Sequence, residues 1–297
     1  MLSYQHDYHA GNFADIHKHL VLRAVLAALQ RRTKPFVALD LHAGAGVYDL
    51  DGERARKTGE AALGIERLRA CACEAALPEA VTGFLETVQQ VAGTDGYPGS
   101  PALIRASLRE NDRLVACEMH PEAHERLQGA FAGDARCHVH RRDAREAARG
   151  LFPPQPRRGF ALLDPSYERP AEYREIAEMA EIILERWNTG MVLVWYPVLA
   201  GRPDHALVER LCTRSIPWLR SELRLRDDPG VERGTSPGLA GSGMLVLRPP
   251  WQLEEELAAT LPAVLGCLDP EGEGALYRSE GLEEGRGDPR LRRVTNV

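Results

Sequence analysis

The chain has 297 residues, of which 44% are hydrophobic and 27% charged, with 37 basic and 43 acidic side chains. The formal net charge of −6 excludes a histone-like protein that grips nucleic acid by bulk charge, although a local basic patch remains compatible with it. Ordinary apolar content and the lack of long charge blocks exclude a disordered chain, and one large domain or two small ones can bury a core at this length.

The start of the chain carries no apolar run that would mark a secretory signal or a membrane anchor. Residues 1–19 contain His, Asp and Lys, and the apolar stretch 20–29 is short and interrupted by Arg23. No stretch reaches the roughly 18 apolar residues of a transmembrane helix. We therefore predict a cytoplasmic protein with no membrane contact. We expect all six cysteines to be reduced thiols, namely Cys71, Cys73, Cys117, Cys137, Cys212 and Cys267.

Short apolar runs alternate with longer amphipathic runs, which is the pattern of an α/β fold with a parallel sheet. In chain order we expect a helix at 15–31, a strand at 36–41, a helix at 101–109, a strand at 114–118, a helix at 121–131, strands at 137–141 and 160–163, a helix at 171–187, a strand at 191–196, a helix at 203–212, strands at 222–226 and 244–247, and a helix at 251–265.

The alternation breaks once, because the segment between the first two strands is far longer than a usual crossover. Residues 59–91 have helical periodicity, so we predict a small helical insertion at 50–97. The rest, 1–49 and 98–270, would form one Rossmann-like domain. We expect the Gly- and Pro-rich segment 227–242 to be mobile, and 271–297 to be a flexible tail.

The first strand runs into a glycine turn, Phe36-Val-Ala-Leu-Asp40-Leu-His42-Ala-Gly44-Ala-Gly46. Glycines two residues apart let the backbone turn sharply and let a ligand approach without a Cβ in the way. The pattern favours a cofactor-binding turn, with a plain strand–helix turn as the alternative. A nicotinamide dehydrogenase is disfavoured, because Asp49 stands where the full G-x-G-x-x-G pattern needs its third glycine.

The second strand, Leu114-Val-Ala-Cys-Glu118, ends in an acid. In dinucleotide and nucleoside folds such an acid accepts hydrogen bonds from ribose hydroxyls. The alternative is a solvated acid at the end of a strand.

A later strand delivers a carboxylate, a rigid proline and an aromatic ring to its carboxyl end, in Phe160-Ala-Leu-Leu-Asp164-Pro165-Ser166-Tyr167. Open α/β sheets bind ligands at this edge. The segment resembles the D/N-P-P-Y/F signature of amino-methyltransferases that use S-adenosylmethionine. In those enzymes the acidic or amide side chain and the next carbonyl accept hydrogen bonds from the target amine, and the ring stacks on the base. The alternative is a proline-ended strand with a tyrosine cap.

The first nineteen residues are dense in chemistry-bearing side chains, with His6, His9, His17 and His19 beside two tyrosines and a lysine. This opening is similar to that of the RlmJ family of 23S ribosomal RNA adenine-N6 methyltransferases. Further motifs of that family follow in the same order: His9-Ala-Gly-Asn12, Lys18-His19, Asp40-Leu-His42-Ala-Gly44-Ala-Gly46, Tyr97-Pro-Gly-Ser100-Pro101, Glu118-Met-His120-Pro121 and Trp195-Tyr-Pro197.

The resemblance covers residues 1–266 and implies a Rossmann-like class I methyltransferase sheet with a small helical insertion after the first strand. It implies S-adenosylmethionine as methyl donor, with no metal, because the sulfonium is already a strong electrophile. Cofactor contacts are implied at His19, His42, Ser100, Glu118, Asp143, Ala144 and Asp164, beside the turn glycines Gly44 and Gly46. Catalytic and target-side roles are implied at Asp164, Pro165, Tyr167, Tyr4, His6 and Lys18.

The implied partner is 23S ribosomal RNA before full assembly, methylated by a monomer at N6 of an unpaired or flipped adenine. Arginines cluster in the sequence around the third and fourth predicted strands. This cluster is compatible with contacts to RNA phosphates and also with an ordinary solvated surface, and it consists of Arg141, Arg142, Arg145, Arg149, Arg157 and Arg158. Ser166 departs from the signature, which has a second proline there. Two alternatives follow: a DNA adenine-N6 methyltransferase, and a catalytically silent RNA-binding factor that keeps the fold.

Overall fold

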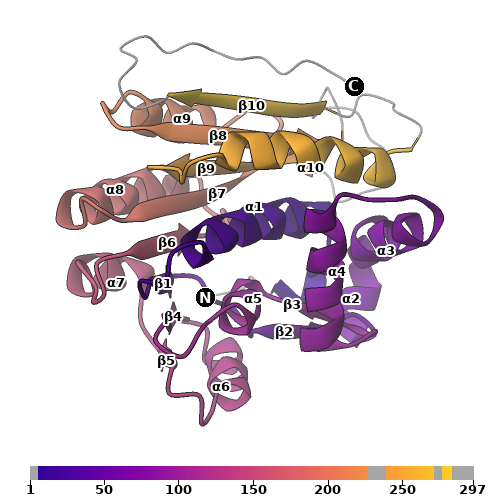
Figure 1. Cartoon of the computed structure of the whole chain (residues 1–297), viewed down its shortest axis with the longest axis horizontal. Helices are drawn as coiled ribbons and strands as arrows, with labels where there is room; N and C mark the ends of the chain where they lie inside the picture. Colours follow the sequence, from indigo (N-terminus) through magenta and orange to yellow (C-terminus); the bar gives the residue numbers. More distant parts are fainter. Residues whose placement is uncertain (1–5, 226–238, 271–275, 283–297) are drawn as a thin grey trace.

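The computed structural model describes residues 6–225, 239–270 and 276–282, and it contains an eight-stranded sheet in the order β10-β8-β9-β7-β6-β1-β4-β5 (Figure 1). These strands are β1 (Val37–Asp40), β4 (Arg113–Cys117), β5 (Cys137–His140), β6 (Gly159–Leu163), β7 (Met191–Leu199), β8 (Trp218–Arg224), β9 (Leu239–Leu247) and β10 (Leu276–Leu282). A separate antiparallel pair joins β2 (Val47–Asp49) to β3 (Gly96–Pro98).

Five neighbouring strands of the sheet, β7, β6, β1, β4 and β5, run parallel to one another. The strand β9 runs antiparallel to β7 and to β8. The predicted α/β fold with a largely parallel sheet is therefore confirmed. Asp40 at the end of β1 is level with Ala116 of β4 on one side and Leu162 of β6 on the other. The carboxyl ends of these three strands consequently meet at one edge of the sheet.

Helices cover both faces of the sheet, and the alternation of side chains along the strands supplies one core to each face. The helices are α1 (Phe13–Gln30), α2 (Glu53–Thr58), α3 (Ile65–Glu74), α4 (Glu79–Ala92), α5 (Ser100–Ala106), α6 (Pro121–Ala130), α7 (Ala144–Gly150), α8 (Ala171–Arg186), α9 (His205–Cys212) and α10 (Leu253–Leu268), with 3-10 turns η1 (His6–Tyr8) and η2 (Glu60–Leu63). Buried side chains of α1, α5 and α10 pack on one face, and those of α7, α8 and α9 pack on the other. No helix among the described residues is long and apolar enough to cross a membrane.

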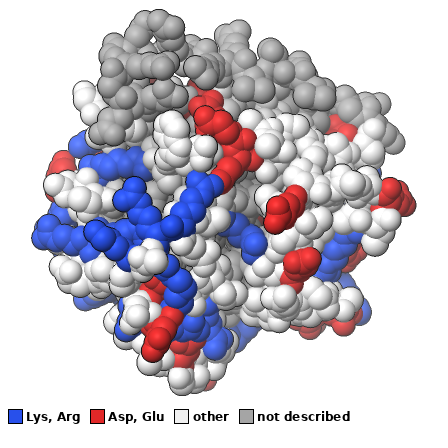
Figure 2. Space-filling view, in the orientation of Figure 1, with Lys and Arg blue, Asp and Glu red and all other residues white. Residues whose placement is uncertain are grey.

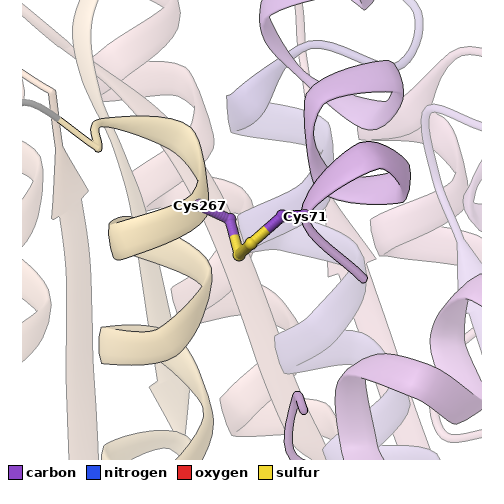
Figure 3. Close-up of a disulfide and its surroundings, with 2 residues drawn as sticks. All are labelled: Cys71 and Cys267. Atoms are coloured by element: carbon purple, nitrogen blue, oxygen red, sulfur yellow. A yellow bond between two sulfur atoms is a disulfide. The ribbon is translucent and has the colours of Figure 1, made fainter. Parts of the chain in front are cut away.

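The segment between β1 and β4 contains α2, η2, α3 and α4, as its helical periodicity predicts. The helix α3 reaches α10, and Cys71 of α3 forms a disulfide with Cys267 of α10 (Figure 3). The expectation of six reduced thiols is therefore wrong for this pair. The sequence did not indicate their proximity, because the two cysteines are 196 positions apart and only the packed fold brings α3 against α10.

The end of the chain also differs from the expected flexible tail. Residues 276–282 form β10, which pairs antiparallel with β8 along its whole length and closes one edge of the sheet. The pairing partner is some fifty residues away in sequence, so local composition gave no sign of it. The rest of the expected tail, and most of the loop expected at 227–242, lie outside the described residues.

Candidate active site

A cavity of about 610 Å³ opens at the carboxyl ends of β1, β4, β5 and β6, beside the first turns of α1. It brings together most of the side chains singled out in the sequence: His6, Lys18, His19, His42, Gly44, Ser100, Glu118, Asp143, Ala144, Asp164, Pro165 and Tyr167. Gly46 does not line the cavity; a Cβ there would lie 2.9 Å from Leu127, so this glycine serves the packing of the turn against α6. Tyr4 lies outside the described residues.

Asp164 follows β6 and lines the cavity. Its backbone N–H donates to Nδ1 of His42 (3.2 Å), and its carboxylate oxygen Oδ2 accepts from the ammonium of Lys18 (2.6 Å). Among the described residues, none donates a hydrogen bond to the other oxygen, Oδ1, or to the carbonyl of Pro165. One carboxylate oxygen is thus fixed by the protein, and two acceptors remain for a ligand.

The ring of Tyr167 packs in a tilted arrangement against Tyr173 (centroids 4.4 Å apart) and Trp195 (5.9 Å). Its hydroxyl donates to the carbonyl of Trp195 (2.7 Å). The backbone of Tyr167 has φ of 52°, a left-handed conformation that a non-glycine residue adopts at a cost of about 1–3 kcal/mol. The tight turn after β6 is therefore held by the ring's own contacts, which place the ring at the cavity wall.

Lys18 is 4% exposed and lies between two carboxylates, 2.8 Å from Oδ1 of Asp15 and 2.6 Å from Asp164. Burial alone would lower the pKa of Lys18, but the attraction of Asp15 and Asp164 raises it above its usual value. The side chain therefore stays an ammonium ion. It also lies 5.8 Å from the ring centroid of Trp195, within the range of a cation–π contact.

Asp15 was not singled out in the sequence, yet it connects the beginning of the chain to the site. Its second oxygen, Oδ2, accepts from Nε2 of His6 (2.9 Å) and from the backbone N–H of Gly11 (3.0 Å). Burial opposes its ionisation, but His6 and Lys18 hold the pKa of Asp15 well below its usual range. The signal that could have found it is spacing, since positions three apart on a helix share a face and Asp15 precedes Lys18 by three.

Glu118 forms another wall of the cavity and links the end of β4 to the glycine turn after β1 through hydrogen bonds. Its Oε2 accepts from the backbone N–H of Gly44 (2.7 Å), and its Oε1 accepts from the N–H of His120 (2.6 Å). Gly44 has φ of 63°, and a Cβ there would lie 2.1 Å from the hydroxyl oxygen of Tyr48. Only glycine fits this positive φ and this close approach to Tyr48, so the predicted sharp turn is confirmed, and the approach of a ligand at this turn stays a prediction.

Behind this wall, Asp40 supports two of the predicted residues. It is fully buried and accepts from the Ser100 hydroxyl (2.6 Å) and the N–H of His42 (3.2 Å). Burial raises the pKa of Asp40 to about 7. Asp143 instead caps α7, with Oδ1 accepting from the N–H groups of Arg145 and of the residue after it. Ser100 is thus committed to Asp40, whereas Asp143 offers its second oxygen to the cavity.

Two neutral histidines complete the polar lining. Burial lowers the pKa of His42 to about 4 and that of His19 to about 3. His42 accepts at Nδ1 from Asp164, so its Nε2 carries the proton. His19 bonds the Tyr97 hydroxyl through Nδ1 (2.8 Å), and its buried Nε2 has no partner among the described residues. The cavity therefore presents unused donors and acceptors on both walls.

Comparison with known proteins identifies the family. A family model described as "Ribosomal RNA large subunit methyltransferase D, RlmJ" matches residues 33–279. The chain belongs to this family. It is 35% identical over 277 residues to Ribosomal RNA large subunit methyltransferase J of Escherichia coli K12, covering 92% of this chain and 96% of that protein. The protein of the same name from Haemophilus influenzae is 34% identical over 280 residues, covering 93% and 97%.

A solved structure shares the architecture of this chain. A crystal structure of a Legionella pneumophila protein matches with a TM-score of 0.83 at 30% identity, over 93% of this chain and 99% of that one. The predicted membership of the RlmJ family and the predicted Rossmann-like methyltransferase fold are therefore confirmed.

Proposed function

We propose that this chain transfers a methyl group from S-adenosylmethionine to N6 of an adenine in 23S ribosomal RNA. The proposal rests on the turn at Asp164 and Pro165, where Oδ1 of Asp164 and the carbonyl of Pro165 accept no hydrogen bond from the described residues and the two residues line the cavity. Membership of the RlmJ family supports the same function. The substrate is ribosomal RNA before full assembly, and the chain acts as a monomer in the cytoplasm. Residues 50–97 form an inserted subdomain of the methyltransferase domain.

The acceptors suit an aromatic amine. The lone pair of adenine N6 is delocalised into the ring, which makes the nitrogen a poor nucleophile. Oδ1 of Asp164 and the carbonyl of Pro165 accept the two amine protons and draw the nitrogen towards a tetrahedral geometry, an interaction strongest in the transition state. The Asp164 carboxylate then takes the proton released by the amine. Lys18 holds Oδ2 in place and leaves Oδ1 for the substrate.

The opposite wall suits the methyl donor. When bound, S-adenosylmethionine supplies a methyl group on a positively charged sulfonium, which needs no metal to make it electrophilic. Glu118 offers carboxylate lone pairs to ribose hydroxyls, Asp143 offers its second oxygen to the adenine, and His42 offers an N–H to a carboxylate. The unpartnered Nε2 of His19 supports this assignment.

The function is tested by giving the purified chain labelled S-adenosylmethionine with a 23S ribosomal RNA fragment or a DNA duplex. We expect N6-methyladenine in the RNA alone, located by mass mapping of nuclease fragments. Product in DNA alone would establish the DNA methyltransferase, and donor binding without product in either polymer would establish the silent RNA-binding factor.

The Glu118→Ala variant should weaken donor binding about ten- to a hundredfold, because hydrogen bonds to a charged acceptor contribute roughly 1.5–3 kcal/mol. Its methyl transfer at saturating donor should fall much less. Calorimetry with S-adenosylmethionine measures the first effect and single-turnover rates the second. Glu118→Gln is the matched control, since it keeps the shape and one acceptor. Unchanged donor affinity in the alanine variant would place the ribose contact elsewhere.

The Ser166→Pro variant restores the family's second proline and should stabilise the protein by about 0.4–1 kcal/mol, by restricting the unfolded chain. No hydrogen bond is lost, because the Ser166 N–H donates to no described residue. Activity should stay equal or rise, since Asp164, Pro165 and Tyr167 are untouched. Denaturant unfolding and turnover measure the two effects. A collapse in turnover with intact donor binding would show that Ser166 itself contributes to the reaction.

A further inference from the structure

Three arginines around α7, Arg141, Arg142 and Arg149, form no ion pair with any residue that the structure describes, and Arg142 among them lines the cavity. We call them the α7 arginine surface, because they lie before, beside and within α7. Their neighbour Arg145 differs, since it pairs with Glu175. Arg142 therefore presents an unpaired positive charge to the cavity.

The three arginines lie within one short segment that ends with α7. Arg142 lines the cavity, and its Nη1 lies 3.7 Å from the position a Cβ would take at Gly150, the last residue of α7. It therefore extends past the helix towards Arg149, while Arg141 stays exposed at the end of β5. Figure 2 shows Lys and Arg gathered on the side of the molecule where Figure 1 draws α7 and α8.

The nearby carboxylates form no ion pair with this surface among the described residues. Asp143 is committed through Oδ1 to the N–H groups at the start of α7, and Glu146 forms no ion pair within the described residues. Unpaired like charges within one short segment repel one another, so this segment favours an anion that meets more than one guanidinium group. The planar guanidinium matches the oxygens of a phosphate group, and a nucleic-acid strand carries phosphates at regular spacing.

We propose that the α7 arginine surface binds backbone phosphates of the RNA strand that carries the target adenine. This inference rests on the proposed function. It assigns the part of the protein that holds the RNA strand beside Asp164 and Pro165. Phosphate contacts fix the register and orientation of a nucleic acid without reading its bases. The surface would thus hold the strand in register while the cavity accepts the adenine.

The chain itself offers a matched set for comparison. Arg32, Arg157 and Arg186 are also exposed and form no ion pair with described residues, but they follow α1, precede β6 and end α8. Each therefore lies near the amino end of a strand, at the edge of the sheet opposite the cavity, whereas Arg141 and Arg142 follow the carboxyl end of β5. Arg157 was expected near the site from the sequence, and the start of β6 at Gly159 places it at the other end.

The experiment compares two triple variants of equal charge, Arg141→Gln/Arg142→Gln/Arg149→Gln and Arg32→Gln/Arg157→Gln/Arg186→Gln. Binding to a 23S ribosomal RNA fragment is measured across a salt titration. The first variant should lose at least about tenfold in affinity, and its slope of log affinity against log salt should become shallower by about two. The second should match the unmodified chain. S-adenosylmethionine affinity, measured by calorimetry, should be the same in all three proteins.

Equal losses of RNA affinity in the two triple variants would overturn the inference, because they would show that the net charge of the protein governs binding. Unchanged RNA affinity in the first variant would also overturn it. The proposed function is read separately, from methylation of the same fragment by the unmodified chain. Product there, together with unchanged RNA affinity in the first variant, overturns the phosphate surface alone. No product there overturns the proposed function.

Discussion

Replacing Asp164 with alanine should lower the rate of methyl transfer at least about 10²-fold, the scale for deleting one preorganised stabilising group. The variant loses the Oδ1 acceptor that faces the cavity and also the Oδ2 partner of Lys18. Single-turnover kinetics at saturating donor and RNA measure the loss. Thermal unfolding is measured alongside, because removing one partner of a buried ion pair can cost about 3–5 kcal/mol.

Two further variants sharpen this result. Asp164→Asn keeps an acceptor oxygen and removes the charge, so its rate should lie between those of the unmodified chain and the alanine variant. Glu185→Ala removes an exposed carboxylate of α8 outside the cavity and should leave the rate unchanged. Near-normal turnover of Asp164→Ala would remove Asp164 from the mechanism and with it the amine as the methyl acceptor.

The sequence was most informative where chemistry is local. The ends of β1, β4 and β6 could be predicted from apolar runs that stop at an acid. Because parallel strands bring such ends to one edge of a sheet, the sequence also predicted that these acids lie close together. Asp164, Glu118 and Gly44 accordingly lie around one cavity.

Features that depend on distant packing could not be read in this way. The Cys71–Cys267 disulfide and the pairing of β10 with β8 join segments that no local pattern connects. The sequence analysis did not predict a role for Asp15, for a different reason. An acid in the first turn of a helix is ordinarily a favourable partner of the helix dipole, and only burial beside Lys18 gives it a further role.

The final prediction concerns Lys18, whose ammonium ion is enclosed by Asp15, Asp164 and the ring of Trp195. The Lys18→Arg variant keeps the charge but places a planar fork in a site filled by a compact group. Oδ2 of Asp164 should then shift, and displacements of about 1 Å at a reacting group can cost up to about 10²-fold in rate. We expect at least a tenfold loss in single-turnover rate, with donor affinity much less affected.

A double-mutant cycle separates positioning from mere stability. If Asp15 acts by holding Lys18 against Asp164, Asp15→Asn should also slow methyl transfer, and combining it with Lys18→Arg should cost less than the sum of the two changes in activation free energy. Additive losses would show that Asp15 and Lys18 act independently. Full activity of Lys18→Arg in a stably folded protein would show that Oδ2 of Asp164 needs no fixed partner, and the free Oδ1 would then owe its orientation to the turn at Tyr167 alone.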